Sequence, residues 1–440
     1  MVQLVRLSQC MIVKNEENNI RRALEWGKGI VFEQIVVDTG SDDHTVQIAE
    51  EMGAIVFHFP WIDDFSAAKN YAISKARGNW IVFLDADEYY AEESARKLIP
   101  ILTRIEKSFY KNAKPHAVRS SLVNLDDKGQ PFSTGIQDRI FRKTSELSYH
   151  NRIHETLHNS NGSDTVVVDA SKELTIYHTG YTRRVYEETR KLERNVRMLE
   201  SEVAENPNDY NAWAYLGDSL FAMESFDKAE QAYLYVIANG DKVSSKARKE
   251  VAFCNYFKLK YLCDSGEEED LLEIYQKAKI LGCQSPDLEY WFGYWYYKKE
   301  DKKRAIQYFD NALKLLDQYK GDSFLDITGG LSEVYQMLFC AYREFGFVNE
   351  MMHYGVLSLR LNLYLMPILQ DIICLLKKEK DEVFTGESTF NLLIKLYNPN
   401  ILKNKLFLLK ASQMADFPAL ENKIRDLFSI EEKIALNDEN

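Results

Sequence analysis

The first part of the chain alternates short apolar runs with amphipathic stretches. Apolar runs that have the length of buried strands occur at 7–13, 34–37, 55–57 and 80–84. Stretches in which apolar residues recur at helical spacing lie between them, at 20–26, 46–52 and 66–76. Strands that alternate with helices predict right-handed crossovers, and therefore a mostly parallel sheet of the α/β class. We expect Ser66 to cap the third helix, because serine accepts hydrogen bonds from the free N–H groups of a first helical turn.

The last of these apolar runs leads directly into two carboxylates, Asp85 and Asp87, which are separated by one alanine. Ligands of α/β sheets bind beyond the carboxyl ends of the strands, and paired carboxylates suit Mg²⁺ or Mn²⁺. Taken alone, the acid pair is equally compatible with an acidic turn that only ends a strand. The sequence contains neither a glycine-rich dinucleotide motif after the first strand nor a Gly-Lys-Ser/Thr phosphate loop. A nucleotide bound here would therefore be held by loop carboxylates and a metal.

A different pattern begins after residue 182, where the chain reads as helical. The residues that carry a tetratricopeptide spacing are Trp213, Leu216-Gly217, Ala229 and Tyr233, and again Phe292-Gly293, Ala305 and Phe309. A degenerate helix pair is expected over 247–281 and a weaker one over 335–354. Aromatic residues in such repeats fill the space between paired helices, so we interpret them as core. Stacked pairs form a surface that commonly binds an extended peptide or another subunit, which leaves peptide binding and a homodimer open.

These patterns predict an α/β domain over residues 1–182, an all-α tetratricopeptide-like domain over 183–430 and an acidic tail over 431–440. The net charge of −12 argues against nucleic acid as a partner. No apolar run reaches the length of a transmembrane segment, and the first residues lack the pattern of a signal peptide. The six cysteines show no Cys-x-x-Cys spacing, which is typical of reduced, buried thiols. We therefore predict a cytoplasmic location.

Motifs in the α/β part follow one another in a defined order. They are Met11-Ile12-Val13-Lys14-Asn15-Glu16, the stretch 36–43, the stretch 61–70 and Asp85-Ala86-Asp87. In sequence and order they resemble the landmarks of family-two glycosyltransferases of the GT-A type, and the resemblance covers most of residues 1–182. Within that family the segment is most similar to enzymes that glycosylate bacteriocin peptides, the glycocin S- and O-glycosyltransferases of the sublancin and thurandacin type. Lys69 departs from the pattern, since many relatives have arginine there.

The resemblance implies a UDP-sugar donor and Mg²⁺ or Mn²⁺ as cofactor, and it implies roles for individual residues. For the nucleotide it implies Asp38, Asp64, Lys69, Asn70 and Asp85, and for the metal Asp85, Asp87 and His178. Glu155 is implied as the base that takes a proton from the acceptor, which the chemistry requires on the face opposite the leaving diphosphate.

Several of these residues also have a structural interpretation. Asp64 and Lys69 are compatible with purely structural roles, Glu155 with a surface carboxylate and His178 with a packed core histidine. His154 is expected to orient Glu155. Arg139 and Arg142 either face the diphosphate or occupy solvated strand positions, and Asp42 and Asp43 are expected to form a turn and a helix cap.

The leading hypothesis is an inverting, metal-dependent hexosyltransferase that moves glucose from UDP-glucose onto a Cys or Ser side chain of a peptide, expected to be rich in cysteine. The alternative is a transferase of the same fold that acts on a saccharide or a lipid-linked cell-envelope acceptor. A third possibility, a repeat scaffold with an inactive transferase domain, is disfavoured by the intact Asp85 and Asp87.

Overall fold

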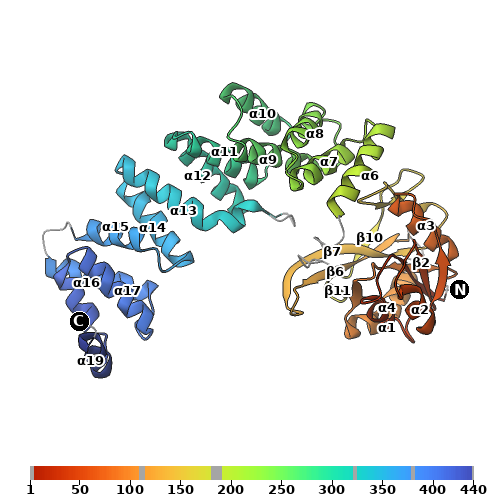
Figure 1. The fold of residues 1–440 in the computed structure, drawn as a ribbon, viewed down its shortest axis with the longest axis horizontal. Helices are drawn as coiled ribbons and strands as arrows, with labels where there is room; N and C mark the ends of the chain where they lie inside the picture. The colour runs from red at the N-terminus through yellow and green to blue at the C-terminus, as the bar shows by residue number, and fades with distance from the viewer. Residues whose placement is uncertain (1–3, 109–113, 180–190, 321–324, 378–381, 439–440) are drawn as a thin grey trace. The chain divides into compact units, whose positions relative to one another are not determined.

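The structure is a computed structural model of the 440-residue chain, and it describes residues 4–108, 114–179, 191–320, 325–377 and 382–438 (Figure 1). By its internal contacts the chain separates into two compact units, Met1–Arg248 and Lys249–Asn440. The expected domain boundary between residues 182 and 183 lies outside the described residues. The first helices of the expected repeat domain belong to the first unit.

The first unit is built on a nine-stranded sheet with the order β3-β2-β1-β4-β7-β6-β11-β5, in which β10 also pairs with β6. Its strands are β1 Leu7–Val13, β2 Glu33–Asp38, β3 Ile55–His58, β4 Trp80–Phe83, β5 Glu88–Tyr90, β6 Ala117–Leu125, β7 Pro131–Arg142, β10 Val167–Asp169 and β11 Thr175–His178. The strands β8 Leu147–His150 and β9 Thr156–Asn159 form a separate two-stranded sheet. The helices packed around the large sheet are α1 Ile20–Glu25, α2 Thr45–Glu51, α3 Phe65–Lys75 and α4 Glu92–Ser108.

The first four strands are parallel, as the alternation of strands and helices predicted. β1 pairs in parallel with β2 and β4, and β2 pairs in parallel with β3. Beyond them the sheet is mixed, because β7 runs antiparallel to both β4 and β6, and β5 runs antiparallel to β11. The carboxyl ends of β1, β2 and β4 therefore meet at one edge of the sheet.

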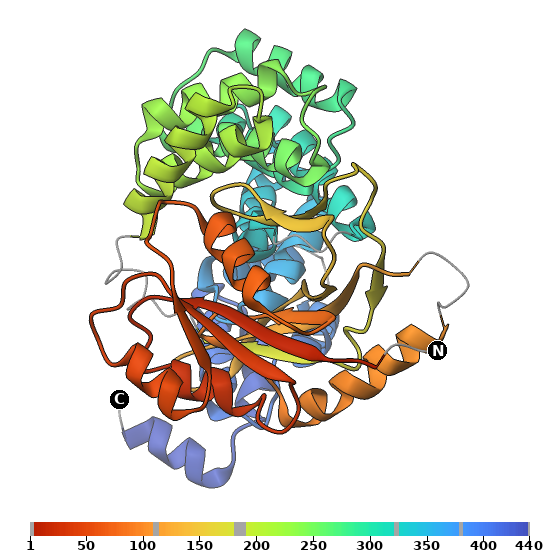
Figure 2. The ribbon, with the colours of Figure 1, turned by 90° about the vertical axis from the view of Figure 1, so that its right-hand side faces the viewer.

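Strand β4 is buried on both faces of the sheet. Trp80 and Val82 pack in one apolar cluster with residues of α4, and Ile81 and Phe83 pack in a second cluster with residues of α3. Figure 2 shows α3 and α4 on opposite sides of the sheet. Because successive strand residues point to opposite faces, a strand that is covered on both faces needs a continuous apolar run. The loop that carries Asp85 and Asp87 begins where this buried strand ends.

Helix α3 begins two residues earlier than predicted. Asp64 is its N-cap: its backbone is extended (φ −149°, ψ 104°), and its side chain accepts a hydrogen bond from the N–H of Ala67 at 2.8 Å. The prediction that Ser66 caps this helix is therefore wrong, because Ser66 already lies within the first turn. The Ser66 hydroxyl instead donates to the carbonyl of Asn151 at 2.6 Å.

The helical part of the chain forms antiparallel pairs that resemble tetratricopeptide repeats (Figure 1). Helices of the first unit are α6 Lys191–Glu205, α7 Tyr210–Ala222 and α8 Phe226–Ala238, and α9 Lys246–Leu262 begins there. The remaining helices are α10 Glu268–Ile280, α11 Pro286–Lys298, α12 Lys302–Gln318, α13 Asp326–Phe345, α14 Val348–Leu361, α15 Met366–Leu376, α16 Glu382–Leu396, α17 Leu402–Met414, α18 Pro418–Arg425 and α19 Ile430–Asp438. Most of the segment that was expected to be an acidic tail is thus helical, and residues 439 and 440 lie outside the described residues.

Two glycines show that the predicted repeats pack alike. A Cβ at Gly217 of α7 would lie 2.6 Å from the ring of Tyr233 on α8, and a Cβ at Gly293 of α11 would lie 2.8 Å from the ring of Phe309 on α12. In each pair, a glycine on the first helix admits a buried aromatic ring of the second. This confirms the tetratricopeptide-like interpretation of the Leu-Gly and Phe-Gly positions.

No helix within the described ranges combines the length and the apolar character needed to cross a membrane. All the cysteines of the chain are free thiols, at Cys10, Cys254, Cys263, Cys283, Cys340 and Cys374.

Candidate active site

Hydrogen bonds join the loops that follow β1 and β2. The amides of Asn15 and Glu16 donate to the hydroxyls of Ser41 (2.9 Å) and Thr45 (2.6 Å), and the amide of Asp42 donates to the Asn15 side chain at 2.9 Å. Asn15 has a positive φ of 57°, which asparagine tolerates better than most residues. The two loops therefore form one surface at the carboxyl edge of the sheet.

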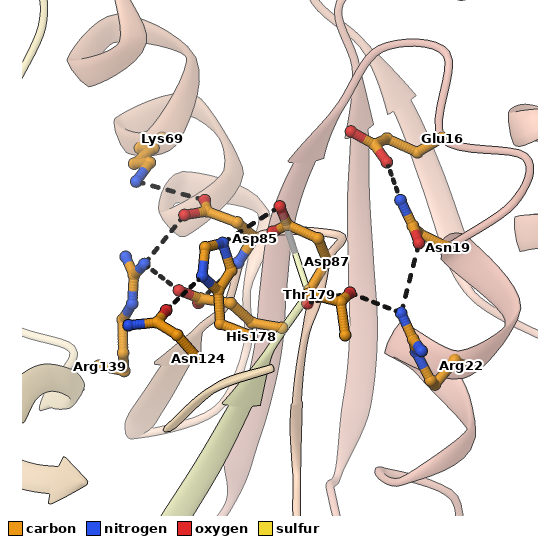
Figure 3. A network of polar contacts seen from close by, with 11 residues as sticks. Glu16, Asn19, Arg22, Lys69, Asp85, Asp87, Asn124, Arg139, His178 and Thr179 are labelled. Atoms are coloured by element: carbon orange, nitrogen blue, oxygen red, sulfur yellow. Dashed lines mark hydrogen bonds and ion pairs between the residues drawn. The ribbon is translucent and has the colours of Figure 1, made fainter. Parts of the chain in front are cut away.

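Strand pairing brings Asp87 and His178 together although they are far apart in the sequence. β11 pairs with β5 so that His178 stands opposite Glu88, the residue after Asp87. The Asp87 Oδ2 and His178 Nε2 atoms are 3.3 Å apart (Figure 3). The amide of Thr179 donates to the Asp87 carbonyl at 3.1 Å, which fixes the backbone of both segments.

The second ring nitrogen of His178 is held by Asn124. The two residues are opposite each other in the parallel pairing of β11 with β6, and His178 Nδ1 lies 2.8 Å from the side-chain oxygen of Asn124. An amide oxygen only accepts, so Nδ1 carries the proton and Nε2 points to Asp87. Burial works against a charged imidazole, but the hydrogen bond to Asp87 and the charge of Asp87 raise the pKa of His178 overall.

Asp85 lies between two cations. Its carboxylate is 2.9 Å from the Arg139 guanidinium and 3.6 Å from Lys69 Nζ (Figure 3). Arg139 also pairs with the buried Glu88. Burial works against ionisation, but the Lys69 and Arg139 charges hold the pKa of Asp85 well below its usual range.

Lys69 is buried, with 2% of its surface exposed, and it links Asp85 to Glu155. Its ammonium forms an ion pair with Glu155 and lies 5.1 Å and 5.2 Å from the ring centres of Phe83 and Tyr149. Burial opposes the charge, yet Asp85 and Glu155 raise the pKa of Lys69 above its usual value. The structure thus joins the acid after β4 to the proposed base through one ammonium group.

Arg142 is buried and Arg139 is half-buried, with 16% of its side chain exposed, so the expectation of solvated strand positions is wrong for both arginines. Arg142 forms an ion pair with Glu106 of α4, donates to the carbonyl of Pro115 at 2.8 Å and lies 4.4 Å from the Trp80 ring. Arg142 thus stabilises the contact between β7 and α4, whereas Arg139 lies in the site through its ion pair with Asp85.

The residues implied for the nucleotide make local contacts in the structure. The Asp38 carboxylate is buried and accepts from the amides of Gly40 (3.2 Å) and Ser41 (3.0 Å). Asn70 exchanges two hydrogen bonds with the backbone of Tyr149, at 2.8 and 2.9 Å. The Asp38 contacts fix the loop after β2, and the Asn70 contacts join α3 to β8.

Asp43 forms the expected turn before α2, because its carboxylate accepts from the Thr45 amide at 2.9 Å and from the Thr45 hydroxyl. The expectation that it caps the helix is wrong, since the N-cap is His44. His154 was expected to orient Glu155. Its ring stacks on Tyr215 of α7, with ring centres 3.8 Å apart and planes 11° from parallel.

The donor set suits a metal ion only in part. Asp87 offers a carboxylate oxygen and His178 an imidazole nitrogen, a combination that Mg²⁺ or Mn²⁺ accepts, and their spacing of 3.3 Å lets both atoms reach one ion. Among the described residues, no group of three or more His, Cys, Asp or Glu side chains is arranged to hold a metal. The remaining positions would have to come from substrate and water.

Three residues of the site were missed as functional candidates. Glu88 and Asn124 hold Arg139 and His178, and Glu16 lies near the acid pair with its carboxylate accepting from Asn19 at 2.8 Å (Figure 3). Burial raises the pKa of Glu16, and the charges of Asp87 and Asp85 act in the same direction. Glu16 was visible in the sequence motif, but the other two depend on strand register.

Comparison with known proteins finds a family match for the N-terminal part of the chain. Residues 8–153 match the family described as Glycosyl transferase family 2. The N-terminal part of the chain is therefore a family 2 glycosyltransferase domain of the GT-A type, as the order of its motifs predicted.

Among curated proteins, the chain is similar to some that are named as glycosyltransferases and to one that is named for its TPR repeats. A TPR repeat-containing protein of Synechococcus elongatus is 32% identical over 236 residues, which cover 52% of this chain and 56% of the relative. The SPbeta prophage-derived glycosyltransferase SunS of Bacillus subtilis is 28% identical over 228 residues, or 51% of each chain. An uncharacterized glycosyltransferase of Rickettsia felis is 43% identical over 159 residues, which cover 35% of this chain and 54% of that protein. The chain spans about half the length of the curated relatives it matches.

Among solved structures, S. aureus TarS 1-349 shares 13% identity with a TM-score of 0.32, over 73% of this chain and 94% of that chain.

Proposed function

We propose that the chain is an inverting, metal-dependent glycosyltransferase that moves a hexose, glucose from UDP-glucose, onto a Cys or Ser side chain of a peptide. One observation carries the proposal. In a family 2 domain, the Asp87–His178 pair lies at the carboxyl edge of the sheet, and Lys69 connects the neighbouring Asp85 to Glu155. A displacement at a sugar carbon needs these two functions side by side, one for the leaving diphosphate and one for the acceptor proton.

Asp87 and His178 would hold one Mg²⁺ or Mn²⁺, with donor phosphate oxygens and water as the other ligands. When bound, the ion offsets the negative charge that develops on the leaving diphosphate. We expected Asp85 to assist as a ligand and to contact the nucleotide. Its ion pairs with Lys69 and Arg139 favour a different role, which is to hold these two cations in place.

Glu155 would accept the proton of the attacking thiol or hydroxyl. The acceptor sulfur or oxygen forms a bond to the anomeric carbon while the bond from that carbon to the diphosphate oxygen breaks, and the nucleoside diphosphate departs with the electron pair. A single displacement inverts the anomeric centre, so an α-linked donor gives a β-linked product. Lys69 keeps the Glu155 carboxylate in position for this step.

For the nucleotide, Asp38 would use acceptor capacity that the amides of Gly40 and Ser41 and the His58 ring leave free, since a carboxylate has about four acceptor sites. Asp64 and Asn70 would act through α3, because one caps this helix and the other ties it to β8. Both contacts fix the helix that carries Lys69.

A peptide acceptor is supported by the likeness of the motifs to glycocin glycosyltransferases and by the similarity to SunS over half of the chain. The helical repeats offer a surface for that peptide or for a homodimer. The free cysteines fit the cytoplasmic location that we propose. The alternative acceptor is a saccharide or a lipid-linked molecule of the cell envelope.

The proposal is tested with the full chain, UDP-glucose, Mg²⁺ and a synthetic peptide that contains one Cys and one Ser. Mass spectrometry of the peptide should show the addition of one hexose, at a residue that fragmentation identifies. Release of UDP without peptide modification, together with labelling of an added oligosaccharide or lipid-linked acceptor, would favour the alternative.

A further inference from the structure

The loop of residues 151–155 connects β8 to β9 and ends at the proposed base, Glu155. Two of its residues have backbones in the left-handed region, Asn151 at φ 75° and His154 at φ 53°. Few residues other than glycine adopt this region, although asparagine and histidine do so more readily than most. The contacts that the loop makes on its two sides decide where Glu155 lies.

On one side the loop is tied to the start of α3. The amide of Phe65 donates to the carbonyl of Arg152 at 2.8 Å, and the hydroxyl of Ser66 donates to the carbonyl of Asn151 at 2.6 Å. Helix α3 also carries Lys69, the ion-pair partner of Glu155.

On the other side the loop is tied to α6, the first helix that the structure describes after β11. The Arg152 guanidinium donates to both carboxylate oxygens of Glu205, at 2.6 and 2.7 Å, and the Arg152 amide donates to Glu202 at 3.4 Å. Both bonds to Glu205 come from one guanidinium nitrogen, Nη2, and they are strengthened by the charges of the two groups.

The next helix, α7, holds the residue directly before the base. The His154 ring stacks on the ring of Tyr215, with centres 3.8 Å apart. The guanidinium of Arg248 lies 4.6 Å from the same tyrosine ring, and Asp218 of α7 holds Arg248 at 3.2 Å. Tyr215 is thus itself fixed within the helical part of the first unit.

From these contacts we infer that helices α6 and α7 position the base of the transferase domain, and that Tyr215 is a positioning residue for Glu155. The inference rests on the proposed role of Glu155. The stacking of His154 on Tyr215 fixes the backbone next to Glu155, and Lys69 fixes the Glu155 carboxylate. The helices therefore help to position the base, whether or not they also bind the acceptor.

The experiment compares full-length Tyr215→Leu, Tyr215→Phe and Tyr235→Leu with the natural chain. Tyr215→Phe keeps a ring for His154. Tyr235 of α8 is a matched control, because it packs on Trp213 in the same helix pair, 4.8 Å between ring centres. Three quantities are measured: hydrogen–deuterium exchange of peptides over residues 150–157, UDP binding with Mn²⁺, and UDP release from UDP-glucose.

Tyr215→Leu should speed exchange in the loop and lower the rate constant of UDP release about 10- to 100-fold, since small displacements of a catalytic group have effects of this size. UDP affinity should change less than about twofold, and Tyr215→Phe and Tyr235→Leu should behave like the natural chain. Unchanged loop exchange in Tyr215→Leu, or faster exchange with an unchanged rate of UDP release, would overturn the inference. A natural chain that releases no UDP would contradict the proposed function, while the exchange data would still decide whether α7 holds the loop.

Discussion

His178 of β11 and Asn124 of β6 stand opposite each other in register, and the histidine Nδ1–H donates to the asparagine oxygen at 2.8 Å. This contact sets which nitrogen of His178 faces Asp87. A ligand histidine whose other nitrogen is held in this way is oriented before any ion arrives.

Replacing Asn124 with Leu should therefore weaken metal binding. We expect the affinity for Mn²⁺, measured by electron paramagnetic resonance in the presence of UDP, to fall about 10- to 100-fold. Ser133→Ala is the matched control, because Ser133 accepts from the other end of the same amide at 2.8 Å and does not involve His178. Equal Mn²⁺ affinity in Asn124→Leu and the natural chain would remove His178 from the metal site.

Glu155→Gln should slow transfer to serine more than transfer to cysteine. A serine hydroxyl depends on the base, whose contribution is typically about 100-fold or more, whereas a few per cent of a thiol is already ionised near neutral pH. Initial rates on two peptides that differ only in Ser or Cys provide the measurement. Glu173→Gln, a surface glutamate paired with Arg104, is the control. Normal rates on both peptides, or an α-linked product, would contradict the assignment.

Lys69→Met should destabilise the first unit. The buried ammonium pairs with Glu155 and Asp85, and its removal leaves Glu155 without this partner and Asp85 with Arg139 alone. Breaking a buried ion pair costs about 3–5 kcal/mol in comparable sites. Urea unfolding monitored by fluorescence measures the change. Lys75→Met on the same helix removes a more exposed ammonium that lies 4.5 Å from the Tyr71 ring, and should cost less than about 1 kcal/mol. Equal losses in the free energy of unfolding for the two substitutions would show that the ion pairs of Lys69 do not stabilise the first unit.

The stability of the second unit should depend on Asp287 in mildly acidic solution. Burial raises the pKa of Asp287 to about 6, although its carboxylate accepts from the amides of Asp326 (2.8 Å) and Ile327 (3.0 Å) at the start of α13. In the unfolded chain the pKa is about 4. Between these values the folded protein retains a proton that the unfolded chain has lost, so stability falls as the pH rises from about 4 to about 6 and is level above that.

Asp287→Asn removes this titration and keeps one acceptor for α13. The difference in melting temperature, variant minus natural chain, should therefore increase from pH 4 to pH 6 and then stay constant. Calorimetry of both proteins across this range is the measurement, and a difference that does not vary with pH would contradict the protonation of Asp287.

Much of the fold was predictable from periodicity. The run 80–84 was predicted as a buried strand, and the Leu216-Gly217 and Tyr233 spacing predicted a packed helix pair. The direction of the first four strands followed from the helices between them, but the antiparallel pairings of the later strands were not predictable. The return of β7 beside β4 depends on tertiary packing alone.

A site residue was predictable where it belongs to a sequence motif, as Asp87 does. It was not predictable where its position in the site depends on the register of strand pairing. Asn124 and Glu88 carry no local signal, and their roles arise when β11 enters between β5 and β6. For Arg139 the sequence left two positions open, and the ion pairs with Asp85 and Glu88 could be known only from the structure.

Metal-dependent glycosyl transfer through Asp87 is tested by UDP release from UDP-glucose in the natural chain and in Asp87→Ala, each with Mn²⁺ and with EDTA. Asp127→Ala, at an exposed position, is the control. We expect UDP release by the natural chain and the control with Mn²⁺, loss of release with EDTA, and near-complete loss in Asp87→Ala under both conditions. An Asp87→Ala protein that releases UDP at the natural rate in the presence of EDTA would contradict the proposed roles of Asp87 and of the metal.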